Sequence, residues 1–298
     1  MTIAGWTADW PISSVEVTDI AKDNDNKCEI PNYPKKVRSH KGLLSSKGII
    51  SCDRKYGCYR LASNLTWIPF PNLKNVSNFL EIHSLNEINK TLIAIGTRYL
   101  GQGIREGFIQ YINLDNGTEW TERKIQLSIF GHCSVAISAT EIMVIGGVKY
   151  DEMVNKVLIT RTRILNIETL NWRNGPSLKQ KRQNYDCTIL EGTVYVVGGR
   201  DENENFLSSI ETLKLEDNEW KFSSKELPTP LAYLQVVASH SLDHIIYLIG
   251  GKTRDCYTCY NKEIYGLRRN GEEWEKVGQL QIGRMNHVTV NANFSDNC

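Results

Sequence analysis

The chain has 298 residues, of which 41% are hydrophobic and 23% charged, and its formal net charge is +1. This composition is typical of a globular protein with a core, and so small a net charge gives no general attraction to nucleic acid or an acidic membrane. No apolar run approaches the roughly 18 residues that a membrane helix needs, so the sequence predicts no membrane span.

Short apolar segments that suit β-strands recur along the chain, and each ends in glycine or another small residue. In chain order they are Ile3-Ala4-Gly5, Ile50-Ser51-Cys52, Ile95-Gly96-Thr97, Ile145-Gly146-Gly147, Val197-Gly198-Gly199 and Ile249-Gly250-Gly251. Their last residues, at 5, 52, 97, 147, 199 and 251, lie 47, 45, 50, 52 and 52 residues apart. A period near 50 residues predicts six copies of one supersecondary unit.

Two further marks keep the same register as these segments. The first is Cys28 followed by Trp67, Trp120, Trp172, Trp220 and Trp274. The second, 12 or 13 residues after each of those, is an aromatic residue or histidine: His40, Phe79, His132, Tyr185, Tyr233 and His287. We expect the tryptophans to lie between neighbouring units, where each N–H can find a carbonyl, and the histidines to be structural residues of the repeat.

The copy between residues 185 and 220 shows the unit most clearly. Residues 194–197 are β-branched or aromatic and bounded by glycine, which is typical of a strand buried on both faces. Residues 210–215 alternate apolar and polar, as in a half-buried strand nearer solvent. With 185–190 before them and Trp220 after an acidic turn, these segments predict four short strands. One such sheet is marginal alone, so it must pack against its copies.

The two ends of the chain predict how the array closes. Residues 1–5 begin inside the second strand of a unit, and residues 288–294 supply one strand beyond the last full unit. We expect the C-terminal strand to complete the N-terminal sheet, which would leave no free sheet edge. Residues 1–298 would then form a single domain.

The combination of marks resembles the kelch repeat over essentially the whole chain. The family pattern of Arg-x-x-His/Tyr, a strand ending in Gly-Gly and a spaced Trp stands here as Arg182…Tyr185, Gly198-Gly199 and Trp220, and again begins at Arg284…His287. The resemblance implies an all-β fold: a six-bladed kelch-type β-propeller with four antiparallel strands per blade. A 50-residue period also suits a four-stranded blade. The first three copies lack a full Gly-Gly pair.

Cations gather in the loops that such blades would place on one face, namely the second-to-third-strand loops and the links between blades. Besides Arg98, they are the candidate partner-binding residues Arg38, Arg54, Arg182, Arg200, Lys252, Arg254 and Arg284. A ring of arginines can clamp the carboxylates of a peptide. Kelch substrate adaptors use arginines in these loops, so the resemblance favours Arg182 and Arg200. The alternative is that Arg38, Arg182 and Arg284 are motif residues paired inside the fold.

The candidate disulfide cysteines are Cys52, Cys58, Cys133, Cys187, Cys256 and Cys259. The first two flank a five-residue loop, the next two fall on the first strands of consecutive blades, and the last two form a lone C-x-x-C without the second pair that a zinc site needs. Each of the first four could instead be a small buried apolar residue. The placement of the cysteines resembles extracellular kelch propellers. The protein would be extracellular if Met1 is an internal start and cytoplasmic if Met1 is the true start.

No catalytic motif stands out, so we expect a non-enzymatic binding module without a cofactor or metal. It would be a monomer that presents face loops to a protein or peptide, an acidic one if the arginines bind it, and not to nucleic acid. Two alternatives stay open. One is a relative of galactose oxidase, whose copper site uses tyrosines, histidines and a Tyr–Cys crosslink. The other is the substrate-recognition propeller of a ubiquitin-ligase adaptor that lacks its N-terminal domain.

Overall fold

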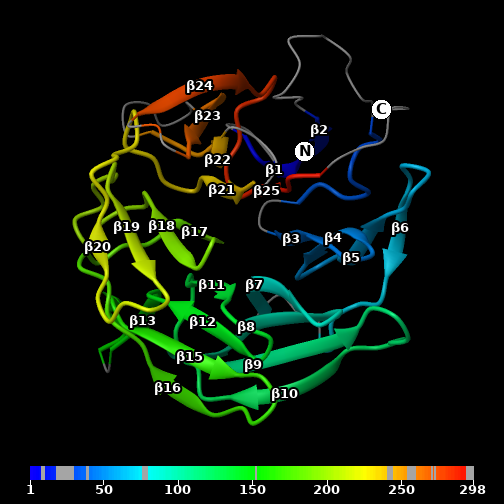
Figure 1. Cartoon of the computed structure of the whole chain (residues 1–298). Helices are drawn as coiled ribbons and strands as arrows, with labels where there is room; N and C mark the ends of the chain where they lie inside the picture. The colour runs from blue at the N-terminus through cyan, green and yellow to red at the C-terminus, as the bar shows by residue number, and fades with distance from the viewer. Residues whose placement is uncertain are drawn as a thin grey trace.

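The computed structural model describes residues 1–7, 11–17, 30–37, 40–75, 80–151, 153–239, 244–253, 260–269, 271 and 273–292. Within these ranges every regular element is a β-strand, and no helix is long and apolar enough to cross a membrane. Six sheets stand around a common axis as a β-propeller (Figure 1). The expected all-β, six-bladed fold is confirmed.

The sheets are numbered here as blades in chain order, each from its innermost strand outward. Blade 1 contains β25 (Val288–Thr289), β1 (Thr2–Trp6) and β2 (Pro11–Glu16). Blade 2 contains β3 (His40–Ser45), β4 (Gly48–Asp53), β5 (Gly57–Leu61) and β6 (Trp67–Phe70). Blade 3 contains β7 (Leu80–Ile88), β8 (Thr91–Gly101), β9 (Ile104–Asn113) and β10 (Thr121–Ile125).

The remaining three blades follow the same order. Blade 4 contains β11 (Cys133–Ala136), β12 (Glu141–Ile145), β15 (Thr162–Asn166) and β16 (Trp172–Asn174). Blade 5 contains β17 (Asp186–Leu190), β18 (Thr193–Val197), β19 (Ile210–Lys214) and β20 (Lys221–Phe222). Blade 6 contains β21 (Gln235–Ala238), β22 (His244–Ile249), β23 (Glu263–Arg268) and β24 (Trp274–Gln279).

The ring closes through the two ends of the chain. Strand β25 pairs antiparallel with β1, with Thr289 opposite Thr2 and Val288 opposite Ile3. The innermost strands contact one another all the way around, in the order β25, β3, β7, β11, β17, β21 and back to β25 (Figure 1). The predicted closure by a C-terminal strand is therefore confirmed. The Cys28 position, where the sequence places the end of the N-terminal copy, lies outside the described residues.

The Gly-Gly pairs allow the backbone of one blade to approach the link to the next. Gly198 and Gly199 have φ angles of +63° and +101°, a region that L side chains rarely adopt. A Cβ on Gly198 would lie 2.5 Å from the carbonyl oxygen of Leu231, and one on Gly199 would lie 2.7 Å from that of Gln183. Both positions therefore require glycine for conformation and for space.

The repeat tryptophans pack between blades, as expected. Trp120 and Trp220 are fully buried. The indole N–H of Trp120 donates to the carbonyl of Pro71 at 2.7 Å, and that of Trp220 donates to Pro176 at 3.0 Å. Trp67 donates in the same way to Pro31 at 3.0 Å. Two repeat tryptophans differ: the N–H groups of Trp172 and Trp274 are buried and have no hydrogen-bond partner among the described residues.

Blades 3 and 4 carry extensions that the sequence did not predict. The hairpin of β8 and β9 has strands of 11 and 10 residues. Blade 4 inserts a separate hairpin, β13 (Val148–Tyr150) and β14 (Lys156–Leu158), between its second and third strands. Both extensions rise from turns between second and third strands, so they project on the same face.

Candidate functional site

The centre of one propeller face is hollowed into a pocket of about 300 Å³. It takes residues from the starts of the six innermost strands or from the links just before them, and from the turn between β4 and β5. The segments that line it are 40–41, 54, 81–83, 130–132, 184–186, 233–235 and 286–287. The second-to-third-strand turns and the blade links therefore open on one face, as the sequence predicted. We call this pocket the central mouth.

Backbone hydrogen bonds tie the links of blades 5, 6 and 1 together at the central mouth. The amide of Tyr233 donates to the carbonyl of Asn184 at 2.7 Å, and the amide of Asn286 donates to the carbonyl of Tyr233 at 3.3 Å. All three residues have φ between +49° and +59°, so the chain turns sharply at each of them. This part of the mouth is a hydrogen-bonded rim rather than a set of independent loops.

Asp186 and Glu81 are the two carboxylates among the described residues that line the central mouth, and Asp186 is the more closely held by a neighbouring blade. Its Oδ2 accepts from the amide of Val236 at 2.8 Å and from Nε2 of Gln235 at 3.0 Å. Burial raises the pKa of Asp186 to about 6, and the charge of Lys41, which lines the same mouth, opposes that rise. The side chain is therefore fixed by the neighbouring blade and is mostly ionised at neutral pH.

The repeat histidines are structural, as the sequence predicted. His40, His132 and His287 are at most 4% exposed. Burial lowers the pKa of His40 and of His132 to about 3, and it also lowers that of His287. Tyr185 occupies the same register and donates its hydroxyl to the carbonyl of Ile145 at 2.6 Å. A histidine held neutral in this way does not exchange protons near pH 7.

Arg182 lies inside blade 5 and not on the face. Its guanidinium donates to the carbonyls of Gly198 at 2.8 Å and Ser209 at 3.1 Å, and to a carboxylate oxygen of Glu211 at 2.8 Å. The side chains of Arg182 and Glu211 are both 0% exposed. An arginine with these contacts cannot clamp a partner without unfolding its blade, so this residue fits the alternative reading of a paired motif residue.

Arg284 has the corresponding place in blade 1. Its guanidinium donates to the carbonyls of Ala4 at 3.2 Å and Ser14 at 2.9 Å, and it pairs with Glu16. Its side chain is 0% exposed. Because Arg284 lies near one end of the chain and its partners near the other, these contacts hold the closed blade together.

The other candidate cations lie nearer the surface or outside the described residues. Arg54 is 3.8 Å from Glu81, and its side chain is 30% exposed. Arg200 pairs with Glu204 at 2.5 Å and donates to the hydroxyl of Tyr233 at 2.6 Å. The backbone of Lys252 bridges to Ala232 and Tyr260. Arg38 and Arg254 lie outside the described residues.

The sequence did not single out Arg105, which organises the wall between blades 3 and 4. It pairs with Glu81 at 2.6 Å, and its guanidinium lies 4.0 Å from the centre of the Phe130 ring. Phe130 in turn stacks on Tyr150 of β13, with ring centroids 5.3 Å apart. This chain of contacts joins the central mouth to the two projecting hairpins. No sequence spacing links Arg105, Phe130 and Tyr150, because the three residues come from separate elements.

Exposed apolar side chains gather at the tips of the two projecting hairpins. Leu100 and Ile104 stand at the turn of β8 and β9, and Met153 and Val154 at the turn of β13 and β14; each is at least 51% exposed. A Cβ on Gly103 would lie 3.2 Å from Cγ1 of Val154, so the tips touch. We call these four residues the apolar tips.

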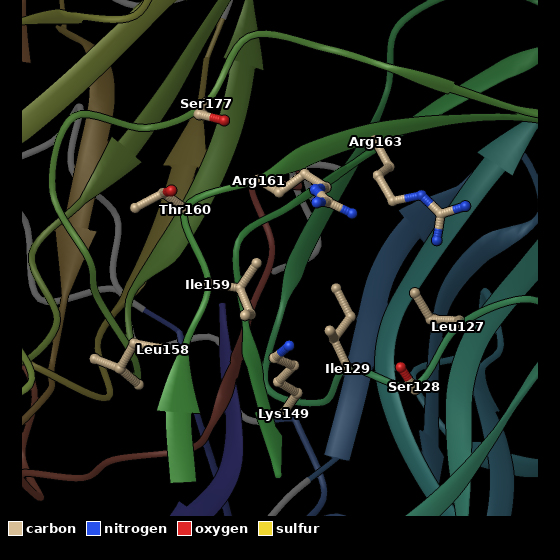
Figure 2. Close-up of a pocket in the computed structure, with 10 residues that line it drawn as sticks. All are labelled: Leu127, Ser128, Ile129, Lys149, Leu158, Ile159, Thr160, Arg161, Arg163 and Ser177. Atoms are coloured by element: carbon tan, nitrogen blue, oxygen red, sulfur yellow. The ribbon is translucent and has the colours of Figure 1, made fainter. Parts of the chain in front are cut away.

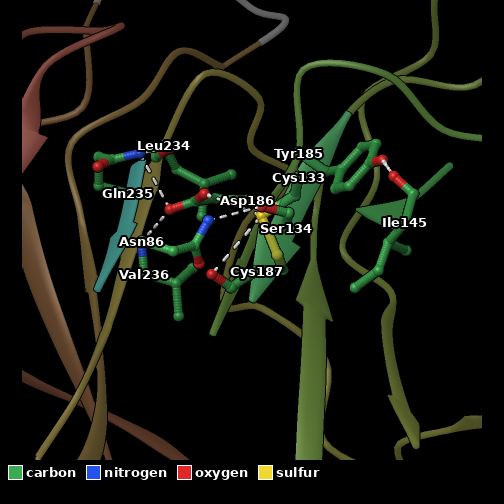
Figure 3. The surroundings of a disulfide bond; sticks show 10 residues. All are labelled: Asn86, Cys133, Ser134, Ile145, Tyr185, Asp186, Cys187, Leu234, Gln235 and Val236. Atoms are coloured by element: carbon green, nitrogen blue, oxygen red, sulfur yellow. Dashed lines mark hydrogen bonds between the residues drawn. A yellow bond between two sulfur atoms is a disulfide. The ribbon is translucent and has the colours of Figure 1, made fainter. Parts of the chain in front are cut away.

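Two of the three candidate disulfides are present in the structure. Cys52 and Cys58 join adjacent strands β4 and β5, and Cys133 joins Cys187 between the innermost strands of blades 4 and 5. Figure 3 shows the second bond beside the central mouth, with Sγ of Cys133 3.7 Å from Oδ1 of Asp186. Cys256 and Cys259 lie outside the described residues.

Comparison with known proteins finds similarity to kelch proteins. A family model described as the Kelch motif matches residues 181–225. Kelch-like protein 41a of Danio rerio is 23% identical over 288 residues, which is 89% of this chain and 45% of that protein. Kelch-like protein 40a of Danio rerio is 32% identical over 127 residues, covering 41% and 20%. The match therefore spans less than half the length of either relative.

One further relative and one solved structure also resemble this chain. Alpha-scruin of Limulus polyphemus is 28% identical over 89 residues, covering 30% of this chain and 9% of that protein. The solved structure titled "Structure of YjhT" superposes with a TM-score of 0.72 at 14% identity, covering 89% of this chain and 90% of that one. At that identity the likeness concerns the fold alone, and it agrees with the closed ring described above.

Proposed function

This chain is a kelch-repeat β-propeller, and we propose that it is a non-enzymatic binding module whose partner, a protein or peptide, docks on the face that contains the central mouth and the apolar tips. We further infer that residues 1–298 fold as one domain, because pairing of β25 with β1 makes the first and last segments parts of one sheet.

The observation that carries the proposal is the distribution of exposed apolar side chains. Among the described residues nine large apolar side chains are exposed, and five of them stand in second-to-third-strand turns of three consecutive blades. These five are Tyr56 of blade 2 and the four apolar tips. Scattered exposed apolar residues are ordinary, whereas a group of them on one set of loops is typical of a protein-interaction surface. We expect the partner to present apolar side chains to it.

We further propose that the partner is acidic, and this part of the proposal rests on two arginines instead of the apolar tips. Arg54 and Arg200 are partly exposed beside the face, but each already faces a glutamate. A carboxylate of the partner would therefore compete with Glu81 or Glu204 for them. We expect these two arginines to select among partners and to speed association more than to supply affinity.

Selection from a random peptide library on the purified protein tests the site. Peptides enriched on the wild-type protein are then measured against the variant Leu100→Asn/Ile104→Asn/Met153→Asn. The matched control is Leu215→Asn/Phe222→Asn, which removes exposed apolar side chains from blade 5. We expect the first variant to lose binding by roughly tenfold or more and the control to retain it, because contacts at the centre of an interface dominate affinity.

Peptides that bind all three proteins equally, or no enrichment on the wild-type protein, would remove the basis for this site. The variant Arg54→Gln/Arg200→Gln tests acidity separately. Acidic enriched peptides that bind this variant several-fold more weakly would support the preference for an acidic partner. Any other result would contradict that preference without affecting the proposed docking site.

The two alternative functions gain no specific support. Among the described residues no group of three or more His, Cys, Asp and Glu side chains is placed to hold a metal ion. The nearest sequence match to a Tyr–Cys pair, Cys256 next to Tyr257, lies outside the described residues. No contact described above favours the ubiquitin-ligase reading over binding in general.

A further inference from the structure

A second pocket lies at the junction of blades 3 and 4, at the root of the β13–β14 hairpin, and has a volume of about 450 Å³. One wall is the link that follows β10, residues 127–129, and the opposite wall is residues 158–161, which lead from β14 into β15. Figure 2 shows these two walls with the side chains of Lys149 and Arg161 between them. We call it the flank pocket.

Three cations line the flank pocket: Lys149, Arg161 and Arg163. No aspartate or glutamate is among its described lining residues, and none of the three cations forms an ion pair with any described residue. Asp151 is the acid that interacts with Lys149, but its two carboxylate oxygens already accept from the amides of Met153 and Asn155 and the side chain of Asn155 at 2.7–3.2 Å. These donors are neutral, so Asp151 stays ionised and offsets part of the charge of Lys149. Because no acid lines the pocket among the described residues, its three cations still leave it a net positive charge.

Two contacts fix the position of the Arg163 side chain at the flank pocket. Its Nη1 donates to the carbonyl of Gln126 at 2.8 Å, and its guanidinium lies 4.2 Å from the centre of the Trp172 ring. Partial burial lowers the pKa of Arg163, and the like charge of Arg161 lowers it further. A bound anion would relieve this repulsion, and most of the N–H donors of Arg163 remain for it because only one of them donates to another described residue.

The rest of the lining indicates what kind of anion fits. Ser128, Thr160 and Ser177 contribute hydroxyl groups that make no hydrogen bond within the described residues, whereas Leu127, Ile129 and Ile159 provide apolar walls. Three separated cations suit the several oxygens of a tetrahedral oxyanion better than the two oxygens of a carboxylate. The volume exceeds that of a bare inorganic ion, and the apolar walls suit an organic group attached to it.

We propose that the flank pocket binds an organic phosphate or sulfate monoester, with Lys149, Arg161 and Arg163 around the oxyanion and the apolar walls around the organic group. The proposal is independent of partner docking on the apolar tips, because none of those four residues lines the flank pocket. The ester group could belong either to a free small molecule or to a modified side chain of a peptide. The experiment below distinguishes these two ligands.

Isothermal titration calorimetry at low salt tests the proposal on the full chain. The probes are phenyl phosphate, phenyl sulfate, inorganic phosphate, and a short peptide with a central phosphotyrosine beside its unphosphorylated form. The variant is Lys149→Gln/Arg161→Gln, which removes two exposed cations that form no ion pair with a described residue. The matched control is Arg123→Gln/Lys214→Gln, which removes two exposed cations outside the pocket. A second variant, Ser177→Asp, leaves the cations and adds a carboxylate to the pocket.

We expect at least one phenyl ester to bind the wild-type protein and the control alike, and to bind either pocket variant more weakly by roughly tenfold or more, because charge-assisted hydrogen bonds are lost or a like charge is added. A phosphopeptide that binds more tightly than phenyl phosphate identifies a modified side chain as the source, and the reverse order identifies a free ester. Equal binding by the pocket variants and the control, binding of inorganic phosphate alone, or no binding of any ester would overturn the proposal.

Discussion

Arg284 makes in blade 1 the same contacts that Arg182 makes in blade 5, although Arg284 is 268 residues away from its partner Glu16 and Arg182 only 29 from Glu211. Each arginine binds two backbone carbonyls of its blade and a glutamate on the third strand. The blade assembled from both chain ends therefore has the internal structure of a continuous one, and its arginine helps to close the ring.

Replacing either arginine should destabilise the fold strongly. We expect Arg284→Met and Arg182→Met each to lower the free energy of unfolding by about 3–5 kcal/mol, because each leaves two backbone carbonyls and a glutamate inside the blade without the guanidinium that pairs with them. Urea unfolding followed by tryptophan fluorescence measures the loss. The exposed Arg123→Met on β10 is the control and should change stability by about 0.5 kcal/mol or less. A cost below about 1 kcal/mol for both buried arginines would contradict their structural role.

The two disulfides should contribute unequally to stability. Cys133 and Cys187 are 54 residues apart, whereas Cys52 and Cys58 are 6 apart. From the loop that each bond closes in the unfolded chain, we expect Cys133→Ala/Cys187→Ala to cost about 4 kcal/mol and Cys52→Ala/Cys58→Ala about 2 kcal/mol. Urea unfolding of the oxidised protein compares them, after mass spectrometry has shown both bonds. An equal or reversed order would show that loop entropy does not govern these bonds.

Acid should destabilise the protein through its buried histidines. The pKa of His132 is about 3 in the folded protein against the usual 6.5, so as pH falls below about 6.5 the unfolded chain takes up a proton first. The stability that this neutral histidine contributes is thus complete above pH 6.5 and is lost as pH falls toward 3. We expect His132→Tyr, which copies Tyr185 in the same register, to reduce the slope of stability against pH by up to about 1.4 kcal/mol per pH unit.

Unfolding free energies between pH 7 and pH 5 test this expectation. Asp186 acts with the opposite sign, because its raised pKa makes the folded protein take up a proton first as pH falls from about 6 toward 4. The variant Asp186→Asn should therefore steepen the acid loss of stability, whereas His132→Tyr should flatten it. An unchanged slope in His132→Tyr would mean that His132 is not kept neutral by the fold.

The sequence by itself determined the architecture. Three sequence features recur with the same period: the Gly-Gly segments, the tryptophans and the His/Tyr positions. Together they indicated six sheets, and the strand segments at 1–5 and 288–294 indicated how the ring of sheets closes. These features were readable because each has a local physical cause: strand periodicity, a positive φ that glycine adopts, and a large apolar ring at a fixed place in every copy.

Only the tertiary structure decided which charged side chains are exposed to a ligand or partner and which are paired inside the fold. Glu211 occupies a polar position of an alternating strand, yet it is fully buried because Arg182 reaches it from the preceding link. The spacing of residues placed Arg182 in a face loop but does not record which way a long side chain turns. In the structure, Arg182 and Arg284 lie inside their blades and not on the binding face. Lys149, Arg161 and Arg163 line one pocket at a blade junction. Neither placement follows from the sequence alone, because contacts between blades depend on side-chain direction and on packing in three dimensions.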